Sequence, residues 1–343
     1  MTRTRLDEIL AGFADASIAV VGDFFLDKYL EIDPALSEVS LETGLEARQV
    51  VRVRCQPGAA GTIVSNLCAL GVGRVVCVGF IGDDGEGFEL TRGLRQMGAE
   101  TNALIVRRDR FTLTYCKTLV RETGGLRELE RLDTKNREPV PADLNDALVS
   151  ELHHVVHEAD AVIAQDQVQE AECGVVTARV REALAELAAQ HAAKTWFGDS
   201  RTRIGEYRNL IVKPNQEECC AAVHPGSPAH DGERAMRCAA ELSGKMGRPV
   251  YLTLGAEGMA LVTPERTQMI PTARLDGELD IVGAGDSATA GIVSALCAGA
   301  TLEEAAIVGN VVASITVQQI GTTGTATQDQ VRDKFARFEG VWG

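Results

Sequence analysis

The stretch of the chain with the clearest chemistry is DIVGAGDSATAG, at residues 280–291. Gly283, Ala284 and Gly285 lie where a strand passes into a helix, and such a loop leaves backbone N–H groups unpaired at the positive end of the helix dipole. Anions bind there, and glycine lets a phosphate approach the backbone closely. Asp286 follows in the first helical turn. From spacing alone, its carboxylate either caps the helix or accepts a substrate proton.

Two common nucleotide-binding signatures are missing from the chain. There is no GxxxxGK[ST] motif, and no GxGxxG follows the first expected strand. The first absence argues against a Walker-type loop, and the second against a dinucleotide-dependent oxidoreductase. The glycine loop therefore predicts a nucleotide site of another type.

Strand-like and helix-like stretches alternate along nearly the whole chain. This alternation predicts an α/β fold with a mostly parallel central sheet and helices on both faces. Ligands bind beyond the carboxyl ends of such strands, and polar or glycine-rich clusters follow several of them. Strands are expected at 17–23, 74–84, 159–166, 194–200, 209–215 and 248–255, and helices at 59–71, 87–98, 141–159, 175–191, 285–300, 301–319 and 328–338.

One segment departs from this alternation. Residues 30–56 have no helical pattern, and 46–56 alternate between polar and apolar side chains as a half-exposed strand does. Residues 112–120 are similar. These pieces predict a small sheet that projects from the main body. The charged run at 127–137 follows it and is typical of a solvent-exposed, salt-bridged surface, with Arg131 and Asp133 facing a substrate as the alternative.

The composition excludes several classes of protein. The 343 residues are 45% hydrophobic and 24% charged, which is ordinary for a globular protein. A net charge of -15 argues against a nucleic-acid or anionic-membrane partner. No apolar run approaches the roughly 20 residues that span a bilayer. The nine cysteines include no CxxC pair, which indicates reduced thiols. We therefore expect a cytoplasmic protein with a small-molecule substrate.

Six stretches, taken in order, resemble the ribokinase-like (PfkB-type) carbohydrate kinases, and most closely the heptose-phosphate kinases among them. The resemblance extends over roughly residues 17–335. It implies a ribokinase-like three-layer sandwich with a small projecting β-lid. It also implies one kinase domain over residues 1–343 with lid insertions at about 30–56 and 110–122. We expect no second catalytic domain, because the chain ends soon after the final expected helix. The six stretches are VVGDFFLDKY, QPGAAGTIVSNLCALG, VGFIGDDGEG, KPNQEE, TLGAEG and DIVGAGDSATAG.

The resemblance implies ATP-dependent phosphorylation of a hydroxyl group on a sugar or sugar phosphate. Asp286 matches the family's catalytic base, which takes the proton from the sugar hydroxyl as it attacks the γ-phosphate. Gly283, Ala284 and Gly285 match the anion hole for the transferring phosphoryl group, where charge stabilisation supplies most of the catalysis.

Sugar-binding positions are expected in the first part of the chain. Asp23 and Asp27 match acids that hydrogen-bond sugar hydroxyls, since each carboxylate accepts several donors. Gly58 and Thr62 lie in the first glycine-rich signature. Arg201 follows a strand and can receive a phosphate with bidentate geometry.

Nucleotide-binding positions are expected in the second part. Gly255 and Gly258 match residues that line the nucleotide site, and Asn310 is expected near the adenine. Asn215 and Glu218 match the motif that organises Mg²⁺, with Glu218 acting through water because Mg²⁺ keeps much of its hydration shell. A monovalent cation and a homodimer formed through the lid complete what the resemblance implies.

Two departures from the family pattern leave the acceptor open. Thr62 stands where an asparagine usually contacts the sugar, and Gln169 and Glu170 occupy a run in which the heptose kinases often carry a lysine. Losing that cation weakens the case for a phosphorylated sugar. Two alternatives therefore stay open, because a fold does not determine a function. One is a non-catalytic sugar- or nucleotide-binding protein, and the other is a nucleoside kinase.

Overall fold

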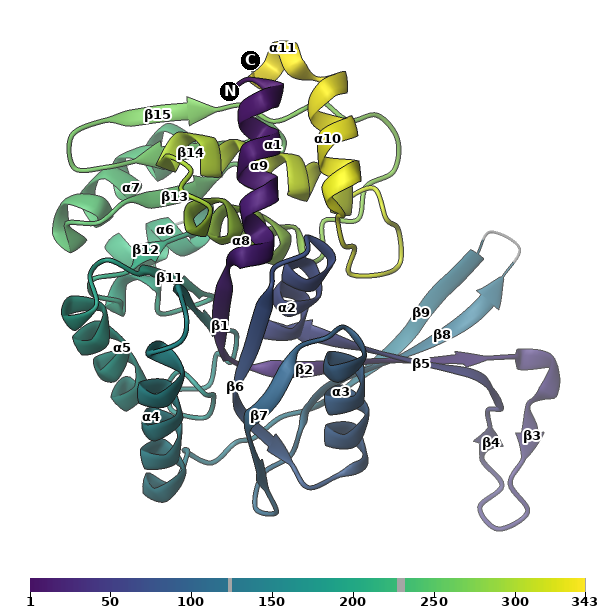
Figure 1. Cartoon of the computed structure of the whole chain (residues 1–343). Helices are drawn as coiled ribbons and strands as arrows, with labels where there is room; N and C mark the ends of the chain where they lie inside the picture. The colour runs from purple at the N-terminus through teal and green to yellow at the C-terminus, as the bar shows by residue number, and fades with distance from the viewer. Residues whose placement is uncertain (123–124, 227–231, 343) are drawn as a thin grey trace.

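The central element of the computed structural model is a nine-stranded sheet (Figure 1). Residues 1–122, 125–226 and 232–342 are described. The strands from β13 to β7 run parallel, and β14 and β15 add an antiparallel edge. In spatial order the sheet contains β15 (Thr267–Ile270), β14 (Met259–Val262), β13 (Val250–Thr253), β12 (Ile211–Val212), β11 (Thr195–Ser200), β10 (Ala161–Asp166), β1 (Ser17–Gly22), β6 (Arg74–Gly82) and β7 (Glu100–Arg107).

Helices cover both faces of this sheet and form two separate hydrophobic cores. Alternate residues of β1 serve opposite cores: Ile18 and Val20 join one, and Ala19 and Val21 join the other. The predicted α/β sandwich is therefore confirmed. The first core contains α1 (Arg3–Ala11), α2 (Ala60–Ala69), α3 (Gly85–Gln96), α8 (Ala284–Cys297), α9 (Leu302–Thr316), α10 (Gln328–Arg337) and α11 (Glu339–Trp342), and the second contains α4 (Ala142–Val156), α5 (Ala178–Gln190), α6 (Gln216–Val223) and α7 (Gly232–Met246).

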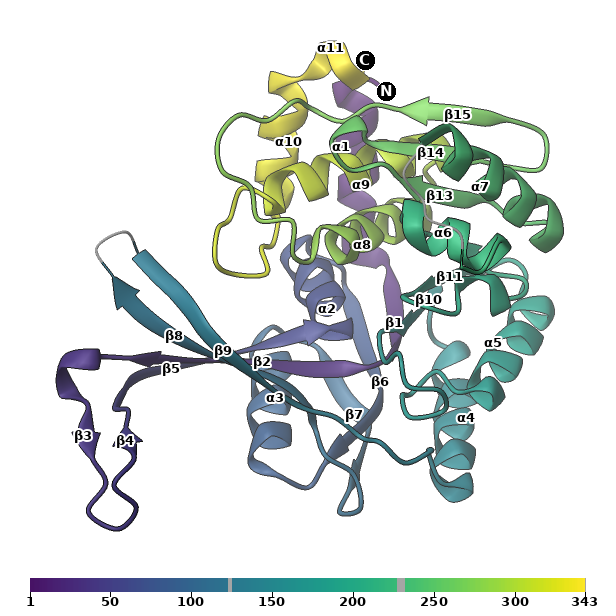
Figure 2. The same ribbon diagram turned by 180° about the vertical axis from the view of Figure 1, so that it is seen from behind.

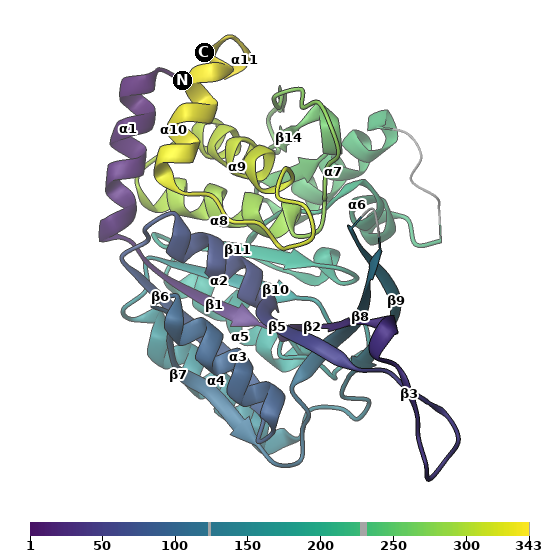
Figure 3. The same cartoon turned by 90° about the vertical axis from the view of Figure 1, so that its right-hand side faces the viewer.

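A second sheet of four strands projects from this body, away from both chain ends (Figures 2 and 3). We call this sheet the lid. In order it contains β5 (Val50–Ala59), β2 (Phe24–Ile32), β8 (Leu113–Glu122) and β9 (Gly125–Thr134). A two-stranded hairpin, β3 (Glu38–Val39) and β4 (Glu46–Ala47), extends beyond it.

The lid is larger than the sequence pattern indicated. It begins at Phe24, before the predicted 30–56 insertion, and its outer strand β9 lies in the run assigned to a charged surface. Both faces of β9 are exposed, so its sequence GLRELERLDT carries no buried apolar face to mark it as a strand. The short strands β14 and β15, of four residues each, also had no predicted counterpart.

The position of α8 depends on close contact with α9. A Cβ atom on Gly309 of α9 would lie 2.6 Å from Cγ1 of Ile292 and 3.1 Å from the carbonyl oxygen of Ala288, both on α8. A Cβ on Gly291 would lie 3.1 Å from Cα of Gly309. Glycine at both positions therefore lets the two helices pack backbone to backbone, which holds the start of α8 in place.

We expect Gly309→Ala to destabilise the protein by about 1–3 kcal/mol, because overpacking this contact forces the helices apart. Thermal unfolding measures the effect. Gly244→Ala in α7 is the matched control, since an added Cβ there meets nothing within 4 Å. That variant should be neutral or gain up to about 1 kcal/mol from helix propensity. Equal melting temperatures for the two variants would contradict the argument.

Candidate active site

A cavity of about 1400 Å³ lies where three parts of the fold meet. Its walls come from the carboxyl ends of β10 to β13, the first turn of α8 and the inner face of the lid. Of the residues predicted for the site, all but Asp23 and Gly58 line it. Those that do are Asp27, Thr62, Arg201, Asn215, Glu218, Gly255, Gly258, Gly283, Ala284, Gly285, Asp286 and Asn310.

The glycine loop forms the start of α8, as predicted, but the strand expected before it is absent: between Ile270, the end of β15, and Ala284 the chain forms no helix or strand. Gly283 is the N-cap residue and has a left-handed backbone with φ of 78°, which favours glycine. A Cβ on it would lie 3.2 Å from Cγ2 of Thr62, whose side chain is buried in α2. The Ala284 N–H donates to the carbonyl oxygen of Ile281 at 3.2 Å, but the other N–H groups at the start of the helix have no intrahelical acceptors, so this turn offers an anion-binding site on the cavity wall.

Asp286 lies in that first turn and is half-buried in the cavity wall. Nε2 of Gln165, at the end of β10, donates to its Oδ1 at 3.1 Å. Burial, and then repulsion from Asp199, raise the pKa of Asp286 to about 7, against the attraction of Lys213 and Arg201. A carboxylate with this pKa can take up a proton at neutral pH, which suits a general base.

A buried ion pair beneath the glycine loop was not predicted. Nζ of Lys213, which directly follows β12, lies 2.8 Å from Oδ2 of Asp199 at the end of β11. Burial opposes the charge on Lys213, but the attraction and hydrogen bond of Asp199 outweigh it and raise the pKa of the ammonium group. A Cβ on Gly285 would lie 3.2 Å from this Nζ. The positions of both residues after strand ends could have signalled them, since such residues gather at one sheet edge.

Asn215 and Glu218 form a reciprocal cap at the start of α6. The Asn215 side chain accepts from the Glu218 N–H at 2.8 Å, and Oε2 of Glu218 accepts from the Asn215 N–H at 2.8 Å. Burial, and then repulsion from Asp199, raise the pKa of Glu218 to about 7. Across the described part of the chain, no group of three or more His, Cys, Asp or Glu residues could hold a metal ion.

Asp27 lines the lid side of the cavity, as predicted. Burial raises its pKa to about 6, against the attraction of Lys117 on β8 and Arg131 on β9. Gly58 on β5 lies behind it, and a Cβ there would come within 2.5 Å of Oδ2 of Asp27. Gly58 therefore makes room for this carboxylate, whereas the prediction had placed it among the substrate-binding residues.

The lid also brings cations to the cavity. Lys117 and Arg131 both line it, and the guanidinium of Arg131 lies 4.7 Å from the ring centroid of Tyr115. Arg131 also pairs with Asp133, at 2.7 and 2.9 Å. The salt bridge expected in this run is present, but Arg131 is part of the cavity wall as well. The pairing of β9 with β8 therefore favours the alternative interpretation, in which Arg131 faces the bound molecule.

Arg201 completes a group of three cations around Asp27 and Asp286 on the cavity wall. When the amide oxygen of Gln167 faces Arg201, it accepts from the guanidinium at 3.0 and 2.9 Å. The amide is neutral, so within the described residues Arg201 makes no salt bridge of the kind that Arg203 makes with Asp166. The predicted role of Arg201 as a phosphate ligand agrees with this position.

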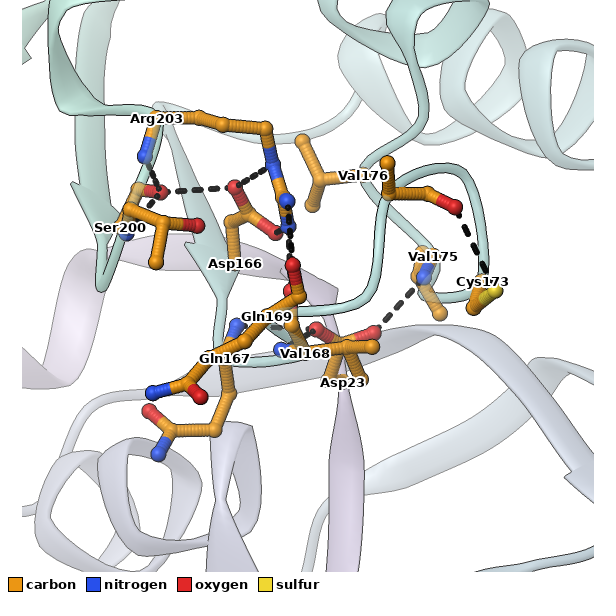
Figure 4. A network of polar contacts seen from close by, with 12 residues as sticks. Asp23, Asp166, Gln167, Val168, Gln169, Cys173, Val175, Val176, Ser200 and Arg203 are labelled. Atoms are coloured by element: carbon orange, nitrogen blue, oxygen red, sulfur yellow. Dashed lines mark hydrogen bonds and ion pairs between the residues drawn. The ribbon is translucent and has the colours of Figure 1, made fainter. Parts of the chain in front are cut away.

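Asp23 needs a correction, because it is buried and is not among the residues that line the cavity. Figure 4 shows its carboxylate facing the loop after β10. Oδ2 accepts from the N–H groups of Gln167 and Val168, at 2.8 and 2.9 Å, and Oδ1 accepts from Val175 at 2.7 Å. Three backbone donors therefore occupy this buried carboxylate. Asp23 fixes the loop after β10 and does not reach the sugar site predicted for it.

Arg203 belongs to the same network (Figure 4). It pairs with Asp166 through Nε and NH2, at 2.9 and 2.6 Å, and also donates to the carbonyl oxygens of Val168 and Gln169. Ser200 donates to Asp166 at 2.7 Å. Arg203 thus fixes the loop after β10 through two of its carbonyl oxygens. Of the two neighbouring arginines, only Arg201 lines the cavity.

The far end of the cavity is formed by β13, β14 and the residues after β15. Gly255 and Gly258 have φ of 60° and 94°, and a Cβ on Gly258 would lie 2.3 Å from the carbonyl oxygen of Ile270. Nδ2 of Asn310 donates to the carbonyl oxygens of Ile270 and Pro271, at 2.9 and 3.1 Å. Asn310 therefore shapes this wall. Apolar side chains complete it, among them Leu275, Leu279, Ile281, Val282 and Val317.

Comparison with known proteins identifies the family. The family model described as pfkB family carbohydrate kinase matches residues 17–329. The chain belongs to the pfkB family of carbohydrate kinases. The resemblance inferred from the six sequence stretches is thereby confirmed.

Curated relatives of this pfkB chain include the bifunctional protein HldE of Gluconobacter oxydans, 28% identical over 323 residues, and that of Desulfatibacillum aliphaticivorans, 29% identical over 325 residues. Each alignment covers 94% of this chain but only 65% and 63% of the relative. The chain therefore spans just under two thirds of the length of these relatives.

Solved structures of similar fold include the ribokinase of Arabidopsis thaliana complexed with ribose and ATP, with a TM-score of 0.67 and 19% identity over 93% of this chain and 98% of that one. The phosphofructokinase-2 of Escherichia coli in complex with fructose-6-phosphate gives a TM-score of 0.69 and 19% identity, over 94% and 99%. Within the described residues, no helix of this pfkB chain is long and apolar enough to cross a membrane.

The raised pKa of Asp286 predicts a dependence of stability on pH. Its pKa is about 7 in the fold but about 3.9 in an unfolded chain, so the folded state keeps the proton to higher pH. Stability is therefore lost as pH rises from about 4 to about 7. Asp286→Asn removes this loss, and we expect its melting temperature at pH 8 to exceed the wild-type value by about 2–4 °C.

The difference should shrink as the pH approaches 4, where the wild-type carboxyl is protonated in both states. Thermal unfolding across this pH range makes the measurement. A variant that is less stable than wild type at pH 8 would show that the ionised carboxylate stabilises the fold.

Proposed function

We propose that this chain transfers the γ-phosphoryl group of ATP to a hydroxyl group of a sugar or sugar phosphate. The observation that carries the proposal is the position of Asp286, in the first turn of α8 beside the glycine loop, on the wall of the large cavity. Its pKa of about 7 matches the task of a general base at neutral pH.

The reaction requires one proton transfer and one phosphoryl transfer. Asp286 takes the proton from the acceptor hydroxyl, whose oxygen forms a bond to the γ-phosphorus. The bond from that phosphorus to the bridging oxygen breaks, and ADP leaves. The N–H groups of Gly283 and Gly285 and the ammonium of Lys213 would face the negative charge on the phosphoryl oxygens, whereas the Ala284 N–H donates to the carbonyl oxygen of Ile281 at 3.2 Å.

The nucleotide fits the part of the cavity beyond the loop. Gly255 and Gly258 keep the wall open there, and the apolar side chains beside Asn310 suit a flat base. Mg²⁺ bound with the nucleotide would neutralise charge on the phosphate oxygens. Glu218, a hard oxygen donor on the cavity wall capped by Asn215, would hold it through water. The monovalent cation stays a prediction.

The acceptor most compatible with the lid carries a negative charge. Lys117 and Arg131 flank Asp27, and Arg201 lies on the same cavity wall. In this proposal these cations bind the phosphate of the acceptor, the role expected of the lysine that heptose kinases often carry near the position of Gln169. We infer a sugar phosphate, with Asp27 accepting sugar hydroxyls and the lid cations receiving the phosphate. A nucleoside is disfavoured, since Tyr115 is the one aromatic residue among the described lining residues.

Three further expectations remain proposals. The lid and its hairpin expose apolar side chains, including Val39, Leu41, Leu45, Val51 and Val53, which supports a homodimer formed through the lid. Sedimentation of the chain tests this, and a monomer at micromolar concentration would contradict it. The single kinase domain over residues 1–343 and the cytoplasmic location stay predictions.

We expect acceptor-dependent ADP release from ATP and Mg²⁺ in a panel of sugars, sugar phosphates and nucleosides. Asp286→Asn should lower the rate about 10²- to 10⁴-fold, because a positioned base contributes that much. Asp329→Asn is the matched control, since Asp329 also lies in a first helical turn but on the surface. ATP binding without turnover on any acceptor would favour the non-catalytic alternative.

We expect Lys117→Met to raise KM for a phosphorylated acceptor about 10- to 100-fold, the equivalent of roughly 1.5–3 kcal/mol for a hydrogen bond to a charged group. KM for the unphosphorylated sugar should change little. Lys28→Met is the control, because Lys28 lies on the opposite face of the lid and pairs with Glu86. Equal changes for both acceptors would exclude a phosphate contact at Lys117.

A further inference from the structure

The end of β10 delivers neighbouring side chains to opposite faces of the sheet. Asp166 lies on the face with Ser200 and Arg203, within the network behind the cavity. Gln165 lies on the other face and reaches Asp286 at the start of α8. It pairs in register with Gly22 of β1 and Asp199 of β11. A Cβ on Gly22 would lie 2.9 Å from Cβ of Gln165, so glycine is needed beside it.

The amide of Gln165 is only half satisfied. Nε2 donates to Oδ1 of Asp286 at 3.1 Å, but Oε1 is buried and has no partner among the described residues. The residue is 3% exposed and lines the cavity. A buried acceptor without a donor is unfavourable, and a bound molecule that supplies a donor removes the penalty.

We propose that Gln165 has two roles in the proposed reaction: Nε2 holds Asp286 in its reactive orientation, and Oε1 accepts a hydrogen bond from a hydroxyl group of the bound acceptor. The proposal rests on the proposed function. The first role makes Gln165 a positioning residue, and the second makes it a determinant of acceptor binding.

The orientation of the amide follows from the charge of Asp286. An ionised carboxylate only accepts hydrogen bonds, so Nε2 must face it and Oε1 must face away. Whatever occupies the site beside Oε1 must therefore be a donor. A sugar hydroxyl meets this requirement, whereas a carbonyl or phosphate oxygen does not.

The hydrogen bond also affects the protonation of Asp286. The charged groups that act on this carboxyl are Asp199 and Asp27, which favour the protonated form, and Lys213 and Arg201, which favour the ionised form. Gln165 is a neutral donor to the ionised form, and donation to a carboxylate lowers its pKa. Removing the donor should therefore raise the pKa of Asp286.

Gln165→Leu removes both hydrogen-bonding atoms and keeps a similar volume. We expect the acid limb of the pH profile of kcat/KM to move to higher pH. The dissociation constant of the acceptor, measured by calorimetry without ATP or Mg²⁺, should rise about 10-fold, as expected for loss of one hydrogen bond. KM for ATP should stay unchanged. Gln165→Glu keeps an oxygen that accepts a hydrogen bond but replaces the N–H donor with a negative charge. Compared with Gln165→Leu, the acid limb should therefore move to still higher pH, and the dissociation constant of the sugar should change less.

Gln268→Leu is the matched control. Its Oε1 is also buried without a partner, but Gln268 lies on β15 and does not line the cavity. This variant should leave the pH profile and acceptor binding as in wild type. Gln165→Leu and Gln165→Glu profiles that coincide with wild type, together with unchanged acceptor binding, would overturn the proposal. If the wild-type protein binds the acceptor but does not turn it over, the proposed function is refuted. The role of Oε1 is still tested in that case, because calorimetry compares acceptor binding by the wild type and by Gln165→Leu without any reaction.

Discussion

The ion pair between Lys213 and Asp199 is the interaction on which the candidate site depends. Lys213 is 4% exposed, and a lone ammonium in that position would lose its charge or destabilise the fold. Asp199 prevents this, at a distance of 2.8 Å. The negative charge of Asp199 also contributes to the raised pKa of Asp286 and of Glu218. The pair thus keeps a cation beneath the glycine loop, while burial, and then Asp199, raise the pKa of both carboxyls to about 7 against the attraction of Lys213.

Hydrogen bonds and close packing fix the backbone segments around the pair of Lys213 and Asp199. Asp23 binds three backbone N–H groups of the loop after β10, and Arg203, paired with Asp166, donates to two carbonyl oxygens of the same loop. Close packing of Gly309 against α8 fixes the first turn that carries Asp286. Side chains that never reach the cavity therefore determine the geometry of those that do, which is the general requirement for a preorganised site.

The lid adds chemistry as well as cover. It supplies Asp27 from β2, Lys117 from β8 and Arg131 from β9 to one end of the cavity. In a chain of net charge -15, this local excess of cations is a specific feature of the site. The heptose-kinase pattern carries its cation after β10, where this chain has Gln169. The family likeness alone therefore does not define the acceptor, and the charges on the lid bear on it more directly.

The sequence by itself determined the features that depend on local pattern: the alternation of strands and helices, and the glycine loop with Asp286 in the first turn of a helix. Periodicity and short motifs involve residues a few positions apart, so they can be recognised without the fold. Only the tertiary structure decided which strand-end side chains meet. In the folded chain Lys213 pairs with Asp199, Gln165 donates a hydrogen bond to Asp286, and Asp23 binds backbone N–H groups instead of lining the cavity. These outcomes depend on strand order and on which face of the sheet each residue occupies, and both are set by contacts between distant parts of the chain.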